Sequence, residues 1–355
     1  MDAWVVREEG DPWEVFRRED FPEPTPETLR GYALGLDGLH PRGASEPACE
    51  DYVLMRVSAA ALAWPDVTMA TGEYPIPIPR PYVSGQEAVG IVEYASPALA
   101  DLEGKRVVAF TPQPFGSLAP LCVATAPTVF EAPPELSDDE AAAFLIASHT
   151  AYHAVHRRGR VRPEETVLVL GAAGGVPSAA VQLCVAAGAR VVAVAGGEEK
   201  VDFCHRLGAQ IVIDHRAEDF VTAVTREVGA SAIDMIVDFV QGEAGQRARP
   251  LLRVEGRHVM AGHAGGLLPV HPNEFYLQNW TLIGCCMGSG YGEALPEIER
   301  QAHDHLLRLV AEGRYRPSVG RVVDFDEVPE ALRDFRERRV LGRTVVRIPQ
   351  ATGGP

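Results

Sequence analysis

Cysteine is scarce in this sequence, and none of its six cysteines belongs to a Cys-x-x-Cys pair. The sequence therefore predicts neither a disulfide framework nor a structural zinc site. Cys285 and Cys286 are adjacent and could form a redox-active pair. They lie in an apolar run from 282 to 287, however, which favours the interpretation that they are buried strand thiols.

Long apolar runs and an excess of basic charge are also missing. No run approaches the ~20 apolar residues of a membrane-spanning helix, and residues 1–8 lack the basic start and apolar stretch of a signal peptide. With 33 basic against 49 acidic residues, the formal net charge is -16, so the surface would repel nucleic-acid phosphates and anionic membranes. We expect a cytoplasmic protein with no nucleic-acid or membrane partner.

The 355 residues are enough for two domains. Residues 1–130 contain short strands between proline-rich and glycine-rich turns, which predicts a β-rich domain with an extended surface loop at about 25–51. Residues 131–288 alternate short β-branched runs with amphipathic segments, which is typical of βαβ units around a parallel sheet. Residues 289–355 end in an alternating strand at 343–348, which could return to the first domain.

The middle region predicts an α/β fold with a doubly wound parallel sheet, as in the Rossmann fold. The expected strands are residues 167–170, 191–194, 211–213, 233–237, 258–260 and 281–286, and the expected helices are residues 176–187, 198–207, 220–228 and 243–252.

A turn of small residues, GAAGGVP at 171–177, directly follows the first of these strands. Such a turn opens a helix at the point where a parallel sheet binds pyrophosphate through backbone amides. The motif is an imperfect GxGxxG, because Ala172 and Pro177 occupy the first and third positions, and a glycine-rich helix cap without a ligand is the alternative. In its strand–turn–helix context it predicts a dinucleotide site, with candidate contacts at Ala172, Gly174, Gly175 and Val176.

The end of the second strand bears on the type of dinucleotide. An acidic residue there would bind the ribose hydroxyls of NAD, but the run at 194–200 is VAGGEEK, with no carboxylate at the strand end. Without that carboxylate a 2′-phosphate is not repelled, and Lys200 or Arg216 could pair with it. We therefore predict NADPH as the cofactor and Gly197 as a further contact. Alternatively, Lys200 is a solvated helix lysine that pairs with neighbouring glutamates.

Motifs over most of the chain resemble the quinone oxidoreductase branch of the medium-chain dehydrogenase/reductase family, which includes zeta-crystallin-like proteins and enoyl-thioester reductases. These motifs are residues 64–66, 71–75, 85–90, 150–152, 171–177, 182–183, 198–200, 207–209 and 342–343. The resemblance implies a GroES-like catalytic domain built from the N-terminal part and the C-terminal tail, an inserted nucleotide-binding domain, and an active site in the cleft. It also implies a homodimer, formed through the edge strand at 281–286.

The zinc-dependent alcohol dehydrogenases of this family bind their catalytic metal with Cys, His and Cys or an acid, and the matching positions here are Ala63, Gln86 and Ile146. Two of these side chains have no donor atom, and an amide is a poor zinc ligand, so no metal is expected. Hydride from NADPH then needs an acceptor that spreads negative charge by conjugation, such as an enone, an enoyl thioester or a quinone. The expected substrate is a hydrophobic or conjugated carbonyl compound.

The resemblance also implies catalytic residues. Tyr74 matches the active-site tyrosine of the enoyl-thioester reductases and could donate to an enolate, although a half-buried loop tyrosine is the alternative. Thr150 matches a position near the nicotinamide; alternatively its hydroxyl bonds its own helix backbone. Trp64 adds apolar bulk beside Ala63, which suggests a flat substrate. His149 could be a second proton source or a satisfied helix histidine.

Further cofactor contacts follow from the same resemblance. Gly262 comes after a strand end, and Cys286 and Met287 occupy the segment whose backbone meets the nicotinamide in relatives. Arg343 replaces the usual lysine near the cofactor phosphates. His215 occupies the position of a tyrosine that often lies beside the 2′-phosphate, where it could stack or bond.

Two other functions stay open. A non-catalytic NADPH-binding protein, as the lens crystallins of this family show is possible, would explain Ala63 and Pro177. A secondary-alcohol dehydrogenase would have to recruit zinc. NADPH consumption with any quinone would argue against the first, and zinc in the purified protein would support the second.

Overall fold

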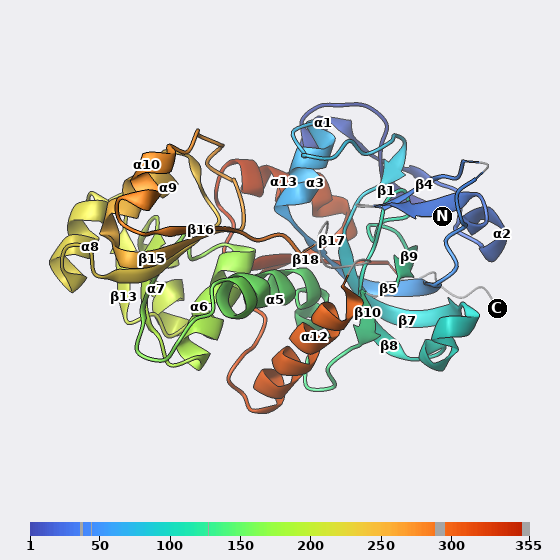
Figure 1. Ribbon diagram of the computed structural model, residues 1–355. Helices are drawn as coiled ribbons and strands as arrows, with labels where there is room; N and C mark the ends of the chain where they lie inside the picture. The colour runs from blue at the N-terminus through green and yellow to red at the C-terminus, as the bar shows by residue number, and fades with distance from the viewer. Residues whose placement is uncertain (36–37, 44, 127, 288–294, 350–355) are drawn as a thin grey trace. The chain divides into compact units, whose positions relative to one another are not determined.

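The structure is a computed structural model, and it describes residues 1–35, 38–43, 45–126, 128–287 and 295–349 (Figure 1). The chain forms two compact units. Unit 1 comprises residues 1–146, 288–301 and 319–355, and unit 2 comprises residues 147–287 and 302–318. None of the described helices combines the length and apolarity that crossing a lipid bilayer requires.

Unit 2 contains a parallel six-stranded sheet in the order β13-β12-β11-β14-β15-β16, which confirms the predicted doubly wound fold. Its strands are β11 (Thr166–Leu170), β12 (Arg190–Ala195), β13 (Ile211–Asp214), β14 (Ile233–Asp238), β15 (Leu252–Met260) and β16 (Thr281–Gly284). β11 and β14 lie at the centre, and the strand order reverses between them. This reversal is the point at which doubly wound sheets bind ligands.

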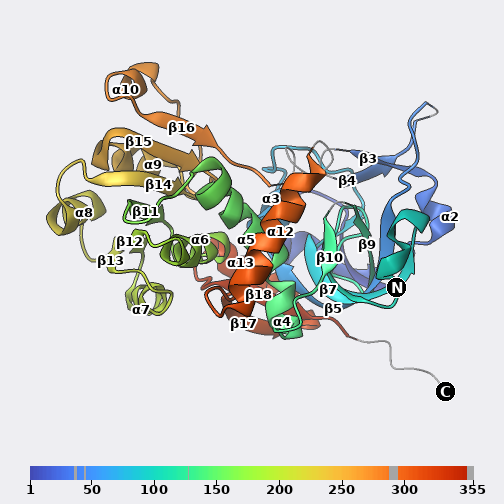
Figure 2. The ribbon, with the colours of Figure 1, turned by 60° about the horizontal axis from the view of Figure 1, so that its bottom comes forward.

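Helices cover both faces of this sheet (Figure 2). They are α5 (Leu145–Tyr152, partly in unit 1), α6 (Gly175–Ala186), α7 (Glu198–Arg206), α8 (Phe220–Val228) and α9 (Gly242–Ala248), with a π-helix at His153–Arg158. The short helix α10 (Pro272–Tyr276) buries none of its residues. The helix predicted at 243–252 ends at Ala248 and gives way to a 3-10 turn, Arg249–Leu251. Pro250 explains this early end, because proline cannot donate the backbone hydrogen bond that would continue the helix.

Unit 1 is built on β-strands. A seven-stranded sheet has the order β10-β8-β7-β5-β18-β17 with β9 paired to β5, a second sheet has the order β2-β1-β6, and β3 and β4 form a hairpin. The strands are β1 (Asp2–Val6), β2 (Phe16–Asp20), β3 (Tyr32–Gly35), β4 (Gly38–Pro41), β5 (Tyr52–Leu62), β6 (Tyr82–Val83), β7 (Glu87–Ala95), β8 (Arg106–Phe110), β9 (Leu121–Thr125), β10 (Val129–Glu131), β17 (Val319–Asp324) and β18 (Arg343–Arg347). The helices are α1 (Pro12–Val15), α2 (Pro26–Leu29), α3 (Trp64–Ala70), α4 (Asp138–Ala142), α12 (Pro296–Ala311, partly in unit 2) and α13 (Val328–Arg336).

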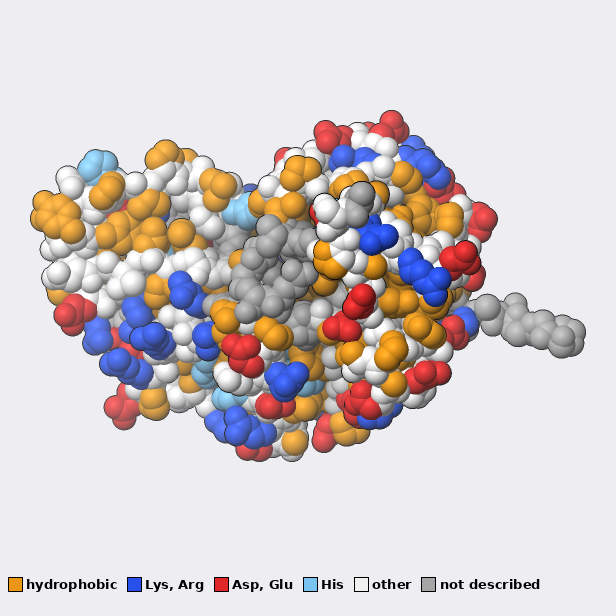
Figure 3. Space-filling model, turned by 45° about the vertical axis from the view of Figure 1, so that its right-hand side comes forward, with side chains coloured by type: hydrophobic (Ala, Val, Ile, Leu, Met, Phe, Trp, Pro, Cys, Tyr) orange, Lys and Arg blue, Asp and Glu red, His pale blue; other side chains and the backbone are white. Residues whose placement is uncertain are grey.

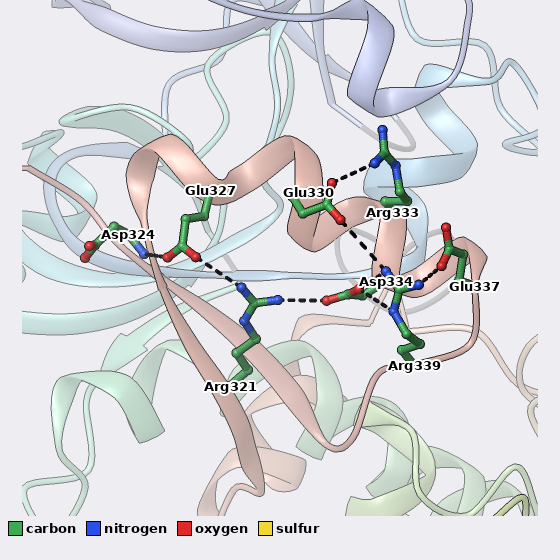
Figure 4. Close-up of polar contacts among 8 residues, drawn as sticks. All are labelled: Arg321, Asp324, Glu327, Glu330, Arg333, Asp334, Glu337 and Arg339. Carbon is green, nitrogen blue, oxygen red and sulfur yellow. Dashed lines mark hydrogen bonds and ion pairs between the residues drawn. The ribbon is translucent and has the colours of Figure 1, made fainter.

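The C-terminal strand β18 joins the N-terminal sheet. β18 pairs antiparallel with β5, with Thr344 opposite Leu62, and its other edge pairs with β17. Ion pairs join β17 to α13 and its N-cap: Arg321 binds the N-cap residue Glu327 at 3.1 Å and Asp334 of α13 at 2.8 Å (Figure 4). Each exposed pair contributes little free energy by itself, but together they link the strand to the helix that follows it.

Residues 25–51 differ from the extended surface loop that the sequence predicts. They contain α2 and the β3–β4 hairpin. Several apolar residues of this segment are buried, and Leu29, Leu39 and Cys49 belong to one cluster in unit 1. Burial of these scattered side chains folds the segment, although they follow neither a helical nor a strand period.

The prediction that Cys285 and Cys286 are buried strand thiols is wrong. β16 ends at Gly284, two residues earlier than expected, and Cys285 is half-buried while Cys286 is exposed. β16 is the edge strand of its sheet, and among the described strands it pairs with β15 alone. The Cys285 amide makes one further bond, donating to the Met260 carbonyl at 2.9 Å, and Cys286 lies beyond the end of the partner strand.

Candidate functional site

The turn between β11 and α6 has the backbone that its small residues predict. Gly171 has a φ of 66°, which favours glycine, and Gly174 is the N-cap of α6. The Ala172 amide donates to the Val194 carbonyl at 3.0 Å and fixes the turn to β12. Pro177 is buried in the first turn of the helix, where its missing N–H leaves no gap in the hydrogen bonding. The first amides of this 12-residue helix can therefore hold an anion.

Two consecutive glycines directly follow β12, and they lie close to basic residues that follow β13. A Cβ atom on Gly196 would lie 2.6 Å from Nε2 of His215 and 3.2 Å from Nε of Arg216. Gly197 has a φ of 94°, and a Cβ atom there would lie 3.3 Å from Nη1 of Arg216. The positive φ of Gly197 favours glycine, whereas a Cβ atom on Gly196 would require the exposed His215 and Arg216 side chains to shift. We call these four residues (Gly196, Gly197, His215 and Arg216) the β12-end cluster.

Asp214 holds the β12-end cluster together, although no motif in the sequence pointed to it. Its Oδ1 accepts hydrogen bonds from the backbone amides of Gly197 and Arg216, both at 2.9 Å. These two bonds lower the pKa of the carboxyl group, because they stabilise its charged form. A weaker signal was present in the sequence: an aspartate at a strand end commonly accepts from the amide two residues later.

Most of the predicted 2′-phosphate contacts lie at or beside this cluster. His215 and Arg216 are exposed, and Lys200 is half-buried in the first turn of α7, where its amide donates to the Gly197 carbonyl at 3.1 Å. Exposed cationic and neutral donors beside a glycine-lined strand end can bind a phosphate group. The acid that binds ribose hydroxyls is missing at the end of β12, and the Asp214 carboxylate is engaged by backbone amides.

The loops after β11, β14 and β15 pack against one another. Cγ2 of Val240 would lie 3.0 Å from a Cβ atom on Gly171, and a Cβ atom on Gly262 would lie 2.8 Å from the Phe239 carbonyl oxygen. Gly262 is thus a position of close backbone approach to the loop after β14. The loop at 239–242 was not predicted as part of the site, because its residues match no short motif.

Thr150 and Met287 are brought together in unit 2. The Thr150 hydroxyl donates to the Met287 thioether at a distance of 3.8 Å, and Met287 is buried. The bond is weak, since sulfur is a poor acceptor, so the hydroxyl can turn to a stronger acceptor. Its neighbour His149 is fully buried, with Nε2 3.2 Å from Nδ1 of His303. This supports the interpretation of His149 as a satisfied helix histidine.

Trp64 and Tyr74 lie at the two ends of α3 in unit 1. Trp64 is the first residue of the helix and is half-buried. Tyr74 follows the helix, and its amide donates to the Thr68 carbonyl at 3.0 Å. The Tyr74 ring is also half-buried and packs against the core of unit 1. The packing role that was the alternative for Tyr74 is therefore present, and it is compatible with a phenol that donates to a substrate.

A buried carboxylate holds the start of α3 in place. Asp66 is fully buried, and it accepts from the Ala63 amide at 2.8 Å, the Ser84 hydroxyl at 2.9 Å and the Gly85 amide at 3.0 Å. Burial raises the pKa of Asp66, while these three bonds oppose the rise. The bonds connect the segment that carries Trp64 to the segment before Gln86.

The sequence predicts that Arg343 lies near the cofactor phosphates. In the structure its ion-pair partner is a glutamate of unit 1. The Arg343 side chain is 4% exposed and forms an ion pair with Glu87, which is 1% exposed and also accepts from the Ile146 amide at 2.8 Å. Burial lowers the pKa of Arg343 to about 10, and nearby Asp66 opposes this shift, so the guanidinium stays charged at neutral pH. The sequence motif located this arginine at the return of the tail, but its partner depends on β18 packing beside β5.

The three positions that match zinc ligands of relatives all lie in unit 1 or at its limit. Ala63 and Gln86 are buried, and Ile146 uses its backbone amide to bind Glu87. Within the described ranges, no three or more His, Cys, Asp and Glu side chains are grouped so that they could hold a metal ion.

Comparison with known proteins gives a family model and several relatives. The model described as zinc-binding dehydrogenase matches residues 175–306. The chain is 31% identical over 301 residues to a subunit of the phenolphthiocerol/phthiocerol polyketide synthase of Mycobacterium tuberculosis, covering 84% of this chain but only 14% of that much longer protein. It is 28% identical over 316 residues to quinone oxidoreductase-like protein 2 of Bos taurus, covering 88% of each protein.

A solved structure is similar over the whole chain. The quinone oxidoreductase of Thermus thermophilus, determined alone and in complex with NADPH, has 30% sequence identity and a TM-score of 0.78. The match covers 98% of this chain and 100% of that protein. The likeness therefore includes both compact units.

Proposed function

We propose that this chain is an NADPH-dependent reductase. It belongs to the medium-chain dehydrogenase/reductase superfamily and to its quinone oxidoreductase and enoyl reductase branch. Its reaction is hydride transfer, without a metal, to an activated C=C bond of an enone or enoyl thioester, or to a quinone. The observation that carries this proposal is the β12-end cluster, where Gly196 and Gly197 lie against His215 and Arg216.

The residues of unit 2 fit NADPH. The Gly171 turn and the N-terminus of α6 offer amides to a pyrophosphate. Arg216 can pair with a 2′-phosphate, and His215 can donate to it or stack on the adenine. The similar quinone oxidoreductase of Thermus thermophilus was solved in complex with NADPH, which supports the same cofactor here.

NADPH, when bound, supplies the hydride. The chain's own residues then have to stabilise the negative charge that develops on the substrate oxygen. Ala63, Gln86 and Ile146 occupy the positions at which zinc dehydrogenases hold their metal, and they provide no suitable donor set. We propose that the Tyr74 phenol donates a hydrogen bond or a proton to that oxygen, that the Thr150 hydroxyl orients a carbonyl or carboxamide group, and that Trp64 supplies apolar surface for a conjugated substrate.

The proposal is tested by following NADPH oxidation at 340 nm with EDTA-treated protein and a panel of quinones, enones and enoyl thioesters. We expect turnover with at least one class, and much slower turnover with NADH. Tight NADPH binding without turnover of any acceptor would instead favour a non-catalytic NADPH-binding protein. Activity that is lost with EDTA and restored by zinc would favour a metal-dependent dehydrogenase.

Replacing Tyr74 with phenylalanine should lower kcat about 100-fold, since positioned proton donors contribute roughly 10²–10⁴. The KM for NADPH should not change. Tyr82→Phe is the matched control: Tyr82 is fully buried in β6 of the same unit, and its hydroxyl has no hydrogen-bond partner among the described residues. If both variants keep the wild-type kcat in steady-state assays, Tyr74 has only its packing role.

We further propose that the protein forms a homodimer through the exposed edge of β16. Apolar side chains gather on this part of unit 2, around α10, at the upper left of Figure 3. The most exposed are Val254 (57%), Leu267 (71%), Tyr276 (66%) and Leu277 (66%). An unpaired strand edge beside an apolar patch is a typical site of association with a second copy.

Leu277→Glu should convert a dimer to a monomer, because it places a charge in the apolar patch. Sedimentation velocity measures the change directly. Val322→Glu is the control, since Val322 is 37% exposed on β17, the outer strand of the unit 1 sheet. Equal dissociation by both substitutions, or a wild-type monomer, would contradict an interface at β16.

A further inference from the structure

We infer that Asp238 and His258, a buried pair beneath the loop at 239–242, are positioning residues that set the affinity for NADPH without touching it. This inference rests on the proposed function, because it assumes that unit 2 binds the dinucleotide. Neither residue belongs to a motif that is recognisable in the sequence.

The position of Asp238 in the sheet is the first argument. It is the last residue of β14, which pairs with β11 on one side and β15 on the other. The strand order reverses between β11 and β14, and doubly wound sheets bind ligands outside the carboxyl ends of their strands at that reversal. The segment after Asp238 and the turn after Leu170 therefore flank the expected cofactor site.

The contacts of Asp238 are the second argument. Its Oδ1 accepts from the amide of Val240 at 2.8 Å and from the amide of Gln241 at 2.7 Å. Its Oδ2 lies 2.9 Å from Nε2 of His258, which donates to the carboxylate. Asp238 is 0% and His258 1% exposed. A buried carboxylate is stable only when its oxygens are hydrogen-bonded. The bond from His258 therefore fixes the carboxylate, and the two bonds from Val240 and Gln241 hold the loop in one conformation.

The loop at 239–242 contacts the turns on both sides of it, so its fixed conformation also restrains them. Val240 packs against Gly171 on one side. On the other side, its carbonyl accepts from the Gly265 amide at 2.7 Å, and the Gln241 side chain donates to the Gly262 carbonyl. Gln241 has a φ of 54° and a ψ of -143°, a conformation that is unfavourable for any residue except glycine and persists only where surrounding contacts enforce it.

A purely structural role is the competing explanation, and the same strand provides a matched control. Asp234 lies at the other end of β14, is 8% exposed, accepts from the Thr166 amide at 2.7 Å and pairs with Arg253 at 2.8 Å. It resembles Asp238 in burial and in its bond to a backbone amide. It is at the amino edge of the sheet, however, away from the Gly171 turn.

The experiment measures the Kd for NADPH by fluorescence titration, and the melting temperature, for the full-length wild type and its variants. Asp238→Ala should raise Kd about 10-fold or more, which corresponds to the loss of about one net hydrogen-bond free energy, while kcat at saturating NADPH falls less. Asp238→Asn should restore most of the affinity, because its amide oxygen can still accept from Val240 and Gln241. Asp234→Ala should lower the melting temperature and leave Kd within about twofold.

The outcomes separate this inference from the function it rests on. If the wild type does not bind NADPH, the proposed function itself fails. If the wild type binds and Asp238→Ala binds equally well, only the positioning role is wrong. Should Asp238→Ala not fold, His258→Leu provides the test, since it keeps both loop bonds but removes the donor to Oδ2. An unchanged Kd in that variant would overturn the inference, and a Kd several-fold higher would support it.

Discussion

Arg343→Met should destabilise the protein by about 3–5 kcal/mol, because it removes the cation from a set of buried charges. Glu87 and Asp66 are 1% and 0% exposed. Their carboxylates cannot reach water when the guanidinium is absent. Equilibrium unfolding in urea at pH 7 measures the change, and the transition of unit 1 should shift while that of unit 2 changes less.

A second arginine on the same strand is the control for Arg343. Arg347 is 65% exposed and pairs with Asp139 at 3.0 Å. Arg347→Met should cost less than about 1 kcal/mol, since exposed ion pairs are worth little. Combining Arg343→Met with Glu87→Gln should recover part of the loss, because the second change removes one unpaired charge. Equal losses for the two arginines would show that the buried ion pair does not contribute as described.

Arg216→Ala should raise the KM for NADPH about 10- to 100-fold, as expected when a charge-assisted bond of roughly 1.5–3 kcal/mol is lost. The KM for NADH should stay unchanged, because NADH has no 2′-phosphate. Arg216 is the exposed cation of the β12-end cluster, and its amide is already held by Asp214. Steady-state kinetics with both cofactors measures the change in preference.

The control for Arg216 is another exposed arginine of unit 2. Arg226 on α8 pairs with Glu218 at 2.7 Å and Glu227 at 3.1 Å, and Arg226→Ala should leave both KM values within about twofold. If Arg216→Ala raises the KM for NADH and NADPH by the same factor, the side chain contacts a part of the cofactor that both share.

The sequence predicts the sheet of unit 2 because its signals are local. Runs such as 167–170 and 191–194 are apolar and β-branched, and each is followed by an amphipathic helix, so each element can be recognised from its own residues. The glycines at 171 and 197 mark turns for the same reason: both require a positive φ. The chirality of βαβ crossovers then limits the possible strand orders to a few.

The sequence could not predict features that depend on distant partners. Asp238 and His258 are 20 residues apart in the sequence and lie on two different strands. The pairing of Arg343 with Glu87 requires the C-terminal tail to pack against the N-terminal sheet. Residues 25–51 fold because separate apolar side chains become buried together. Burial of this kind leaves no period in the sequence, so the segment resembles a loop.

The place of β18 in its sheet also constrains the order in which the units can form on the ribosome. β18 lies between β5 and β17, yet its residues are synthesised after all six strands of unit 2, which lie between residues 166 and 284. Unit 2 can therefore assemble its sheet before β18 is made, while residues 59–62 of β5, which β9 does not pair with, wait uncovered for some 280 residues, from Leu62 to Arg343. An uncovered strand edge can pair with other chains, so slow translation of the segment between β16 and β18 should favour aggregation of nascent unit 1.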